Sequence, residues 1–244
     1  MKSAGLTDVG MLRHENQDAF GALPLACGAT LAAVCDGMGG VSGGRIASAL
    51  CLDTFRSVLA ECEEITDDLL DAALDAANDA LRARAKELGL DCMGTTLVLA
   101  LATETAVRLF WVGDSRAYLY HAGRITRITH DHSFVQSLID EGRITEEEAR
   151  RHARRNLITR AVGTKDHVAG DHREVLWETG DRILLCSDGL YGMVEDRELC
   201  EILSEDDNLE HTAHVLISAA NSHGGEDNIT ALILENTKEN SSDA

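Results

Sequence analysis

Four aspartates that lie far apart in the chain each stand where a short apolar run meets a tight turn. They are Asp36, Asp114, Asp188 and Asp227; the first three follow apolar runs and the fourth precedes one. Short runs rich in Val, Ile and Leu and bounded by Gly, Ser or Asn are typical of buried strands. A carboxylate at such an edge is not a packing residue. The repeated placement therefore predicts a fold that gathers acids at one end of a sheet.

Carboxylates gathered in this way need a partner. They repel one another and take up protons unless a cation keeps them ionised. Oxygen ligands without paired His or Cys favour hard ions such as Mg²⁺ or Mn²⁺ over zinc. Each aspartate alone is better explained as a turn residue, but their joint recurrence beside Gly or Ser favours a multi-carboxylate metal site.

The composition is strongly acidic, with 42 acidic and 22 basic residues among 244 and a formal net charge of −20. This charge disfavours nucleic acid and anionic membrane surfaces as partners. No stretch approaches the roughly 20 apolar residues of a membrane span, and the N-terminus lacks the apolar core of a secretory signal. The seven cysteines form no C-x-x-C pair and fall mostly within apolar runs, as reduced and buried thiols do. We therefore expect a cytoplasmic protein.

The pattern of elements predicts an α+β fold. Helical periodicity is strongest over residues 67–88, behind a Thr66 cap. Further helices are expected over residues 46–60, 134–141, 146–155, 197–204 and 209–222, and further strands over 95–102, 117–123 and 124–129 with a hairpin turn around Gly123. Helix pairs between meander-like β segments favour layered α+β architecture over βαβ winding.

No Pro- or Ser-rich linker divides the chain, so we expect one domain over residues 1–235. From Asn236 the sequence is polar and without periodicity, which predicts a disordered tail over residues 236–244.

Two segments near the first acids can approach a ligand. The run DGMGGVSGGR, from Asp36 to Arg45, is rich in glycine, which allows either close contact of backbone with a ligand or a simple strand-to-helix turn. It contains neither nucleotide-binding glycine motif, so a nucleotide cradle is unsupported. Arg13 precedes Asp18 by a few residues, and its planar fork could clamp a phosphate, although alone it reads as a surface ion-pair residue.

Eight motifs in order resemble the metal-dependent protein phosphatases of the PPM group, also called type 2C serine/threonine phosphatases. They span Thr7 to Leu234, and the bacterial stand-alone members are the most similar, because they are similarly short and carry DGMGG. The motifs are R-x-x-NQDAF, DGMGG, MGTTL (93–97), VGDSRAY (112–118), T-x-DHS (129–133), RNLITRAVG (155–163), LLCSDGLYGMV (184–194) and GGEDNIT (224–230).

The resemblance implies a four-layer α-β-β-α sandwich, in which two central antiparallel sheets are flanked by helix pairs. It implies two Mn²⁺ or Mg²⁺ ions at one end of the sheets. In that arrangement Asp36 bridges both ions, the carbonyl of Gly37 binds the second, and Asp188 and Asp227 bind the first.

The resemblance implies further roles. Asp18 would hold a water of the second ion, a third and weaker ion would bind between Asp114 and Asp188, and Arg13 would take the phosphate. A metal-bridging water or hydroxide, with a pKa lowered toward about 7 to 9, would attack the phosphorus directly. The sequence agrees with a route that has no phosphoenzyme, because no Cys has an Arg six positions later and no D-x-D motif occurs.

The chain departs from the animal members at Met38. Those members carry His there as a proposed general acid, and methionine cannot donate a proton. We leave the acid unassigned: a metal-bound water could serve, or His130 or His132 could reach, although both are better explained as structural hydrogen-bonding residues.

The run RRHARR, residues 150–155, is the one basic run in the chain and falls in the flap region of the family. It could attract phosphopeptides. The alternative, which we favour, is that Thr145 and Glu148 form a capping box and the arginines complement the C-terminal end of the helix dipole.

The leading hypothesis is a monomeric serine/threonine protein phosphatase that opposes a protein kinase in a bacterial cytosol. Two alternatives remain: a catalytically silent metal-binding regulator on the same fold, and a hydrolase of small phosphomonoesters. The intact aspartates and Arg13 argue against the silent regulator. A two-metal nuclease is disfavoured by the negative charge.

Overall fold

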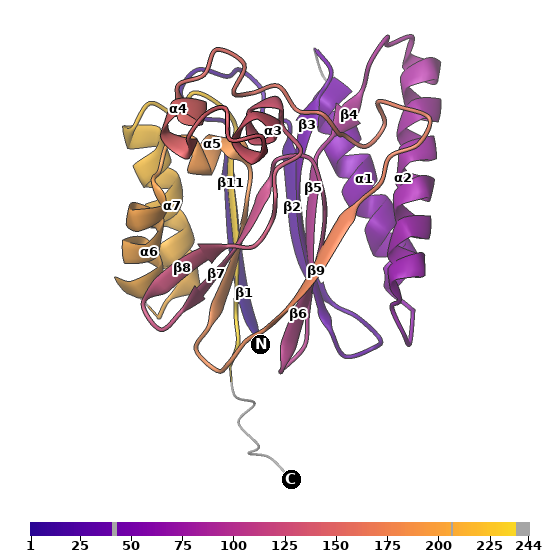
Figure 1. Ribbon diagram of the computed structural model, residues 1–244. Helices are drawn as coiled ribbons and strands as arrows, with labels where there is room; N and C mark the ends of the chain where they lie inside the picture. Colours follow the sequence, from indigo (N-terminus) through magenta and orange to yellow (C-terminus); the bar gives the residue numbers. More distant parts are fainter. Residues whose placement is uncertain (41–42, 206, 238–244) are drawn as a thin grey trace.

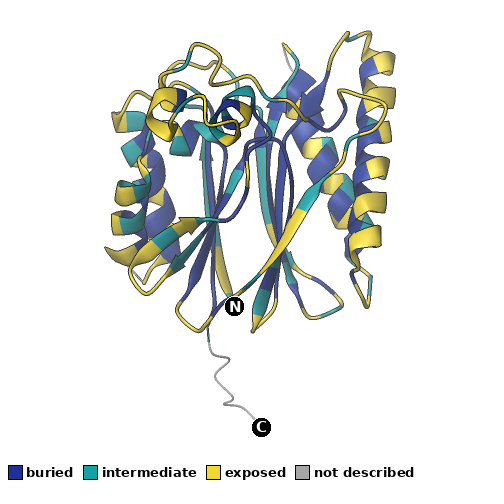
Figure 2. Ribbon diagram, in the orientation of Figure 1, coloured by how far each residue is buried: buried dark blue, intermediate teal, exposed yellow. Residues whose placement is uncertain are grey.

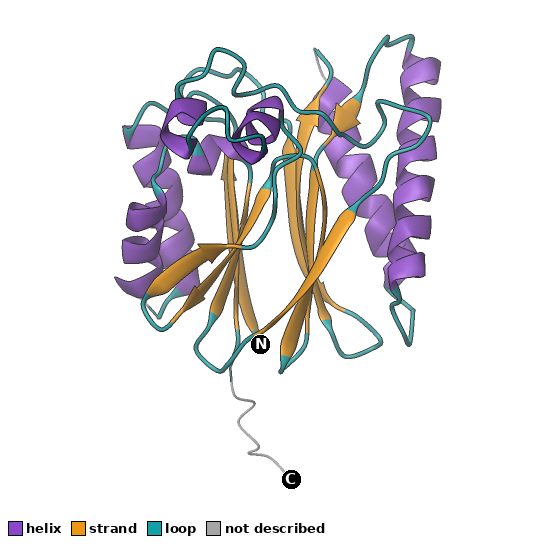
Figure 3. Cartoon of the chain, in the orientation of Figure 1, coloured by secondary structure: helices purple, strands orange, loops and turns teal. Residues whose placement is uncertain are grey.

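The computed structural model describes residues 1–40, 43–205 and 207–237. Two antiparallel sheets pack face to face, and helices cover the outer face of each (Figures 1 and 3). The predicted four-layer α-β-β-α sandwich is confirmed.

One sheet has the order β1-β11-β10-β7-β8, and the other β2-β3-β5-β6-β9, with β4 paired to β3. The strands are β1 (Lys2–Asp8), β2 (Asp18–Pro24), β3 (Thr30–Met38), β4 (Gly94–Thr95), β5 (Leu97–Ala102), β6 (Ala106–Val112), β7 (Arg116–His121), β8 (Arg124–Arg127), β9 (Asp171–Leu176), β10 (Arg182–Cys186) and β11 (Ile229–Glu235). The helices are α1 (Gly43–Leu59), α2 (Asp67–Leu88), α3 (Phe134–Asp140), α4 (Glu146–Arg150), α5 (Asp188–Tyr191), α6 (Asp196–Glu205) and α7 (Leu209–Ser222).

Three apolar layers hold the four layers of the sandwich together. Val34, Leu109 and Leu185 belong to the layer between the two sheets. A second layer joins α1 and α2 to the sheet that contains β3, and a third joins α6 and α7 to the sheet that contains β10. Figure 2 shows the consequence: the strands and the inner helix faces are buried, while exposed residues lie on the outer helix faces. Burial of apolar surface on this scale is the main stabilising term of such a fold.

Helix α2 begins and ends where its sequence predicts. Thr66 Oγ1 accepts a hydrogen bond from the backbone N–H of Leu69, and Gly89 ends the helix in the left-handed conformation at φ 65°. Leu70 and Leu81 are buried as the periodicity predicts, whereas Leu88, in the last turn, is exposed. The predicted packing face is therefore correct from Leu70 to Ala85, and the predicted bounds of the helix are correct to the residue.

Other boundaries differ from the prediction. The helix expected over residues 146–155 ends at Arg150, and strands β1, β2 and β9 were not predicted. β9 is an edge strand with mostly exposed side chains, so it carries no apolar alternation. β1 gains its strand conformation from its pairing with β11, which runs from Lys2 opposite Glu235 to Asp8 opposite Ile229.

The C-terminal end of the fold extends slightly beyond the predicted domain. Asn236 is buried, and its backbone N–H donates to the carbonyl of Asp181. The rest of the predicted tail, from residue 238, lies outside the described residues. Among the helices that the structure describes, none is both long and apolar enough to span a membrane.

The cysteines only partly match the expectation. Cys35, Cys51 and Cys186 are buried, but Cys92 is exposed, and the other three are partly buried. All seven are free thiols.

Candidate active site

The site lies at the end of the sandwich where β3, β6 and β10 finish and β2 and β11 begin, on the side of α3, α4 and α5 (Figure 1). Asp18 and Asp36 are direct neighbours across the β2–β3 pair. Side chains at directly opposed positions point to the same face, about 4.5–5.5 Å apart at Cβ. Two like charges at such a pair destabilise the sheet unless something neutralises them.

The backbone around Asp36 is held rigidly. Its N–H donates to Thr96 Oγ1 at 2.9 Å, and its carbonyl accepts from Thr95 Oγ1 at 2.9 Å. Gly37 pairs with Thr95 in the register of β3 and β4. The chain therefore presents the Asp36 carboxylate and the Gly37 backbone from a fixed position at the strand end.

The predicted acids come together around one cavity, which we call the metal cavity. It has a volume of about 520 Å³. Its lining includes Asp36, Asp114, Asp188, Asp227 and Arg13. The sequence prediction that distant strand ends gather carboxylates is confirmed.

Burial and mutual repulsion alter the ionisation of these acids. Burial, and then the charges of the neighbouring aspartates, raise the pKa of Asp36 well above its usual range, and burial does the same for Asp114. Burial raises the pKa of Asp18 to about 7 despite two hydrogen bonds, and that of Asp188 to about 6. Without a cation, the folded protein therefore holds protons here that free aspartates would release near neutral pH.

Two carboxylate oxygens in the site are buried and make no hydrogen bond to any described residue: Oδ1 of Asp18 and Oδ1 of Asp188. The other oxygen of Asp18 accepts from Ser187 Oγ at 2.8 Å and from Thr230 Oγ1 at 2.6 Å. A buried oxygen without a donor is costly, and such groups call for an explanation such as an ion.

Arg13 is the one arginine among the described residues that line the metal cavity. Its Nη2 donates to Asp227 Oδ2 at 2.7 Å, and its side chain is 55% exposed. Asn228, next to Asp227, accepts from the N–H of Gln17 and donates to the carbonyls of Val9 and Glu15. These bonds fix the loop that carries Arg13 beside the segment that carries Asp227.

Comparison with known proteins identifies the family. The family model "Protein phosphatase 2C" matches residues 13–229. The chain belongs to the protein phosphatase 2C family.

Members of the family in bacteria are closely similar. The chain is 38% identical over 235 residues to the serine/threonine phosphatase stp of Listeria monocytogenes, covering 94% of this chain and 93% of the relative. It is 41% identical over 240 residues to the serine/threonine protein phosphatase PstP of Mycobacterium tuberculosis, covering 96% of this chain and 45% of that longer protein.

Solved structures agree with the family assignment. The S. agalactiae serine/threonine phosphatase superposes with a TM-score of 0.90 at 31% identity, covering 95% of this chain and 98% of the other. The catalytic domain of PstP, solved in complex with two manganese ions, superposes with a TM-score of 0.84 at 37% identity, covering 96% and 97%.

Phosphatases of this family are metal dependent, and the donor set of this chain fits a metal ion. Among the described residues, no three His, Cys, Asp or Glu side chains already stand in a metal-binding arrangement. Instead Asp227 accepts a hydrogen bond from Arg13, and Oδ1 of Asp188 has no hydrogen-bond partner among the described residues. A cation with oxygen ligands accounts together for the shared cavity, the two unbonded carboxylate oxygens and the raised pKa values.

The structure assigns both candidate histidines to structural hydrogen bonds. His130 Nε2 lies 2.9 Å from Asp140, and the Nδ1 of buried His132 accepts from the N–H of Gly113 at 3.1 Å. Burial, and then the Arg160 charge, lower the pKa of His132. Neither histidine lines the metal cavity, whereas Met38 does.

The first arginine of the basic run over residues 150–155 has the helix-capping environment that the favoured interpretation predicts. Thr145 and Glu148 form the capping box, three glutamates occupy the first turn of α4, and Arg150 is in the last. Beyond the helix, Arg155 donates to Glu226 at 2.8 Å.

Sequence reasoning missed Ser187 and Thr230, the two hydroxyl residues that hold Asp18. Ser187 directly precedes Asp188, and Thr230 follows Asp227 by three residues, so both stood inside motifs that had been noticed for their acids. The pairing of β10 with β11 places the two hydroxyl residues side by side, and the packing of that sheet against the sheet that contains β2 brings both to the same oxygen.

Proposed function

We propose that this chain hydrolyses phosphoserine and phosphothreonine in proteins, using divalent metal ions. The observation that carries the proposal is the metal cavity, in which four aspartates from distant strand ends surround one space with Arg13 at its edge. A phosphate ester is the substrate class that needs both features, because its oxygens are anionic and its phosphorus must be approached by a nucleophile.

The ligand roles belong to the proposal. Asp36 and the Gly37 carbonyl, held by β3 and β4, would bind metal together with Asp188 and Asp227. Asp18 would hold a water of the second ion through Oδ1, which makes no hydrogen bond to any described residue. We propose Mn²⁺ or Mg²⁺ for two core positions, and a third, weaker position at Asp114 and Asp188.

When bound, a divalent ion supplies Lewis acidity, which acidifies water and neutralises phosphoryl charge. The chain contributes the positioning. Arg13 would exchange its bond to Asp227 for the phosphate oxygens, which its planar fork matches better. Ser187 and Thr230 fix the Asp18 carboxylate through one oxygen, and the other oxygen is buried without a hydrogen bond to any described residue.

The finer biological expectations are proposals as well. We propose one catalytic domain over residues 1–235, a cytoplasmic location, a monomeric enzyme and a cognate serine/threonine protein kinase whose products it reverses. The net charge of −20 supports protein rather than nucleic-acid substrates.

The deciding experiment is phosphate release from a phosphothreonine peptide. We expect release with Mn²⁺, none with chelator, and a loss of at least about a thousandfold in Asp36→Asn, because the central carboxylate would be lost. Asp79→Asn is the matched control, since its side chain is 77% exposed on α2. Release that persists with chelator, or in Asp36→Asn, would reject the proposal.

The same assay separates the alternatives. A silent regulator would show Mn²⁺ binding in calorimetry but would release no phosphate. A small-molecule hydrolase would turn over p-nitrophenyl phosphate and leave phosphoproteins intact.

A further inference from the structure

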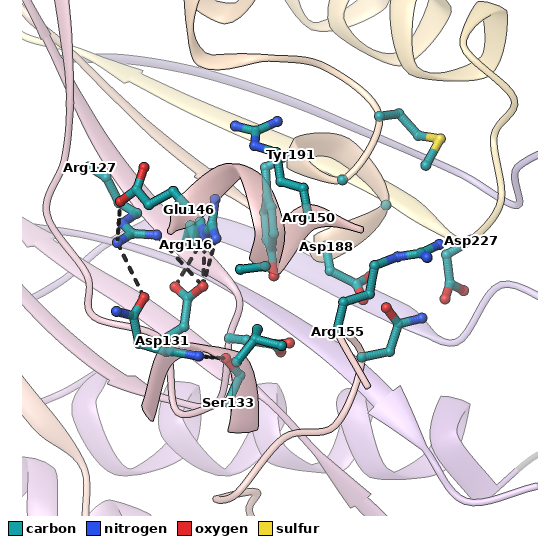
Figure 4. Close-up of a pocket in the computed structure, with 18 of the residues that line it drawn as sticks. Arg116, Arg127, Asp131, Ser133, Glu146, Arg150, Arg155, Asp188, Tyr191 and Asp227 are labelled. Atoms are coloured by element: carbon teal, nitrogen blue, oxygen red, sulfur yellow. Dashed lines mark hydrogen bonds and ion pairs between the residues drawn. The ribbon is translucent and has the colours of Figure 1, made fainter. Parts of the chain in front are cut away.

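A second cavity adjoins the metal cavity under the flap segment, which we define as residues 134–158 (Figure 4). We call it the flap cavity; its volume is about 250 Å³. Three acids, Asp114, Asp188 and Asp227, line both cavities, as Arg13 does. A group bound in the flap cavity therefore lies beside the proposed position of the reacting phosphate.

One arginine that lines the flap cavity, Arg116, is already neutralised by Asp131. Arg116 donates from Nη2 to Asp131 at 2.7 Å and from Nε to both oxygens of the same carboxylate at 3.1 Å. Its guanidinium carbon lies 3.6 Å from the centre of the Tyr191 ring. Because this pair is nearly buried and multiply bonded, it is a fixed support and not a free anion ligand.

Two other arginines at the cavity have no carboxylate of the described residues within hydrogen-bond distance. Arg127 lies 3.8 Å from Asp131 and 3.7 Å from Glu146, and Arg150 lies 3.7 Å from Asp196. These distances are longer than hydrogen bonds, and the hydrogen bond that Arg127 donates, at 3.3 Å, goes to the neutral amide of Gln136. The side chains of Glu146 and Asp196 are 73% and 47% exposed, so they can turn into solvent at little cost. In Figure 4, Arg127 and Glu146 lie on one side of the cavity, and Asp188 and Asp227 on the other.

We propose that Arg127 and Arg150 form a second anion subsite, which takes another phosphate group carried by the same substrate close to the residue being dephosphorylated. The inference rests on the proposed function. A phosphate dianion offers more charge and more acceptor oxygens than the carboxylates it displaces, and guanidinium forks match it in geometry. Val135, Ile139 and Met193 supply apolar wall for the connecting peptide.

The surrounding charge makes such a subsite selective. In a chain with a net charge of −20, a multiply phosphorylated peptide is repelled by most of the surface. Arg127, Arg150 and Arg155 line this cavity beside seven carboxylates, three of which, Asp114, Asp188 and Asp227, are the proposed metal ligands and would be neutralised by bound cations. Substrates with two neighbouring phosphates would therefore be favoured over those with one.

The test compares kcat/KM for three peptides that share one phosphothreonine. The first has serine two residues away, the second has a non-hydrolysable phosphonate analogue of phosphoserine there, and the third has glutamate. A second set places the same groups on the other side of the phosphothreonine. We expect the phosphonate peptide to be preferred by about tenfold, the lower end of the effect of a hydrogen bond between charged groups, because the second phosphate must displace existing carboxylate partners.

The variants report on the ratio between peptides, in which any general loss of activity cancels. Arg127→Gln combined with Arg150→Gln should reduce the preference to less than about threefold, because both ligands of the second phosphate are gone. Arg151→Gln is the matched control, since its side chain is 81% exposed next to Arg150. If the double variant does not fold, Arg150→Gln alone, half-exposed in the structure, carries the test.

The outcomes are distinct. A collapse of the preference in the double variant but not in Arg151→Gln supports the subsite. No preference in the wild type, an unchanged preference in the double variant, or an equal preference for glutamate would overturn it. Release from the serine peptide in those cases would leave the proposed function standing, whereas absence of release from all peptides would reject the function itself.

Discussion

Arg13 and Asp227, separated by 214 residues in the sequence, are joined by a hydrogen bond of 2.7 Å. The residue proposed to bind phosphate thus holds a residue proposed to bind metal. Both side chains are partly exposed, at 55% and 28%, so the pair itself contributes little to stability. Its importance is that the bond joins the proposed phosphate ligand directly to a proposed metal ligand, so that a phosphate held by the fork of Arg13 would lie beside a cation held by Asp227.

Replacing Arg13 should therefore affect catalysis more than folding. We expect Arg13→Ala to lower kcat/KM on a phosphothreonine peptide by about a hundredfold, as loss of a charged hydrogen-bond pair does. Arg13→Lys should recover only part of this, because lysine lacks the planar fork. The control is Arg45→Ala, an equally exposed arginine paired with Glu15. Kinetics indistinguishable between Arg13→Ala and Arg45→Ala would contradict the role of Arg13.

The buried acids predict an unusual dependence of stability on pH. The pKa of Asp18 is raised from 3.8 to about 7, and that of Asp188 from 3.8 to about 6. Between about pH 4 and pH 7 the folded protein therefore binds more protons than the unfolded chain. The contribution of these two acids to the stability of the metal-free protein should be greatest below about pH 4 and should be lost as the pH rises to about 7. For Asp18 alone the loss is on the order of 4 kcal/mol.

Calorimetry in chelator and in Mn²⁺ tests this dependence. The unfolding temperature should fall from pH 5 to pH 7 in chelator, and the fall should vanish with Mn²⁺, since the cation stabilises the ionised acids. Asp18→Asn should flatten the slope in chelator. A metal-free protein that becomes more stable over this range would show that the acids are not in the state described.

The fold was predictable where local and tertiary signals agree. Strand β3, which contains Asp36, and strands β6 and β10, which end just before Asp114 and Asp188, carry their own apolar runs, and the helix behind Thr66 carries its own periodicity and caps, so the sequence indicates them directly. β1 and β9 have no such pattern, because one depends on β11 for its pairing and the other is an exposed edge. The acids of the site were predictable for the same reason as their strands.

What the sequence did not indicate is the set of contacts made across the sheets. The hydroxyl pair on Asp18 depends on the pairing of β10 with β11 and on the packing of their sheet against β2, and hydroxyl residues near a turn carry no signal of their own. The bond from His132 to Gly113 likewise depends on a tertiary approach that no spacing reveals. The sequence can therefore indicate which acid is functional from its residue type and position, but the residues that hydrogen-bond to that acid become known only from the fold.

The hydroxyl pair gives a prediction about metal affinity. Ser187→Ala removes the 2.8 Å hydrogen bond to Asp18 Oδ2 and leaves that carboxylate less well oriented. We expect Mn²⁺ affinity, measured by calorimetry, to weaken by about tenfold, the lower end of the effect of losing such a supporting bond. Ser204→Ala, which removes only a hydrogen bond to a backbone carbonyl on exposed α6, is the control. Equal affinities in the two variants would exclude a supporting role for Ser187.

Gly37 gives a prediction about stability, because the surrounding backbone leaves no room for a side chain at this position. A Cβ at Gly37 would lie 2.1 Å from the carbonyl oxygen of Gly44 and 2.6 Å from that of Gln17. Both contacts are with backbone, so Gly37→Ala must displace β3 or the start of α1. We expect it to lower the free energy of unfolding by about 3 kcal/mol and to abolish metal binding.

The matched control for Gly37 is Gly21, on the neighbouring strand β2. There the nearest atom to an added Cβ is Leu52 Cδ2 at 3.6 Å, an ordinary van der Waals distance. Gly21→Ala should therefore change stability by less than about 1 kcal/mol, because alanine also reduces the entropy of the unfolded chain. Urea unfolding in chelator measures both variants without a contribution from bound metal. If Gly37→Ala unfolds at the same urea concentration as Gly21→Ala, then the close approach of β3 to α1 does not hold the proposed metal-binding backbone in place.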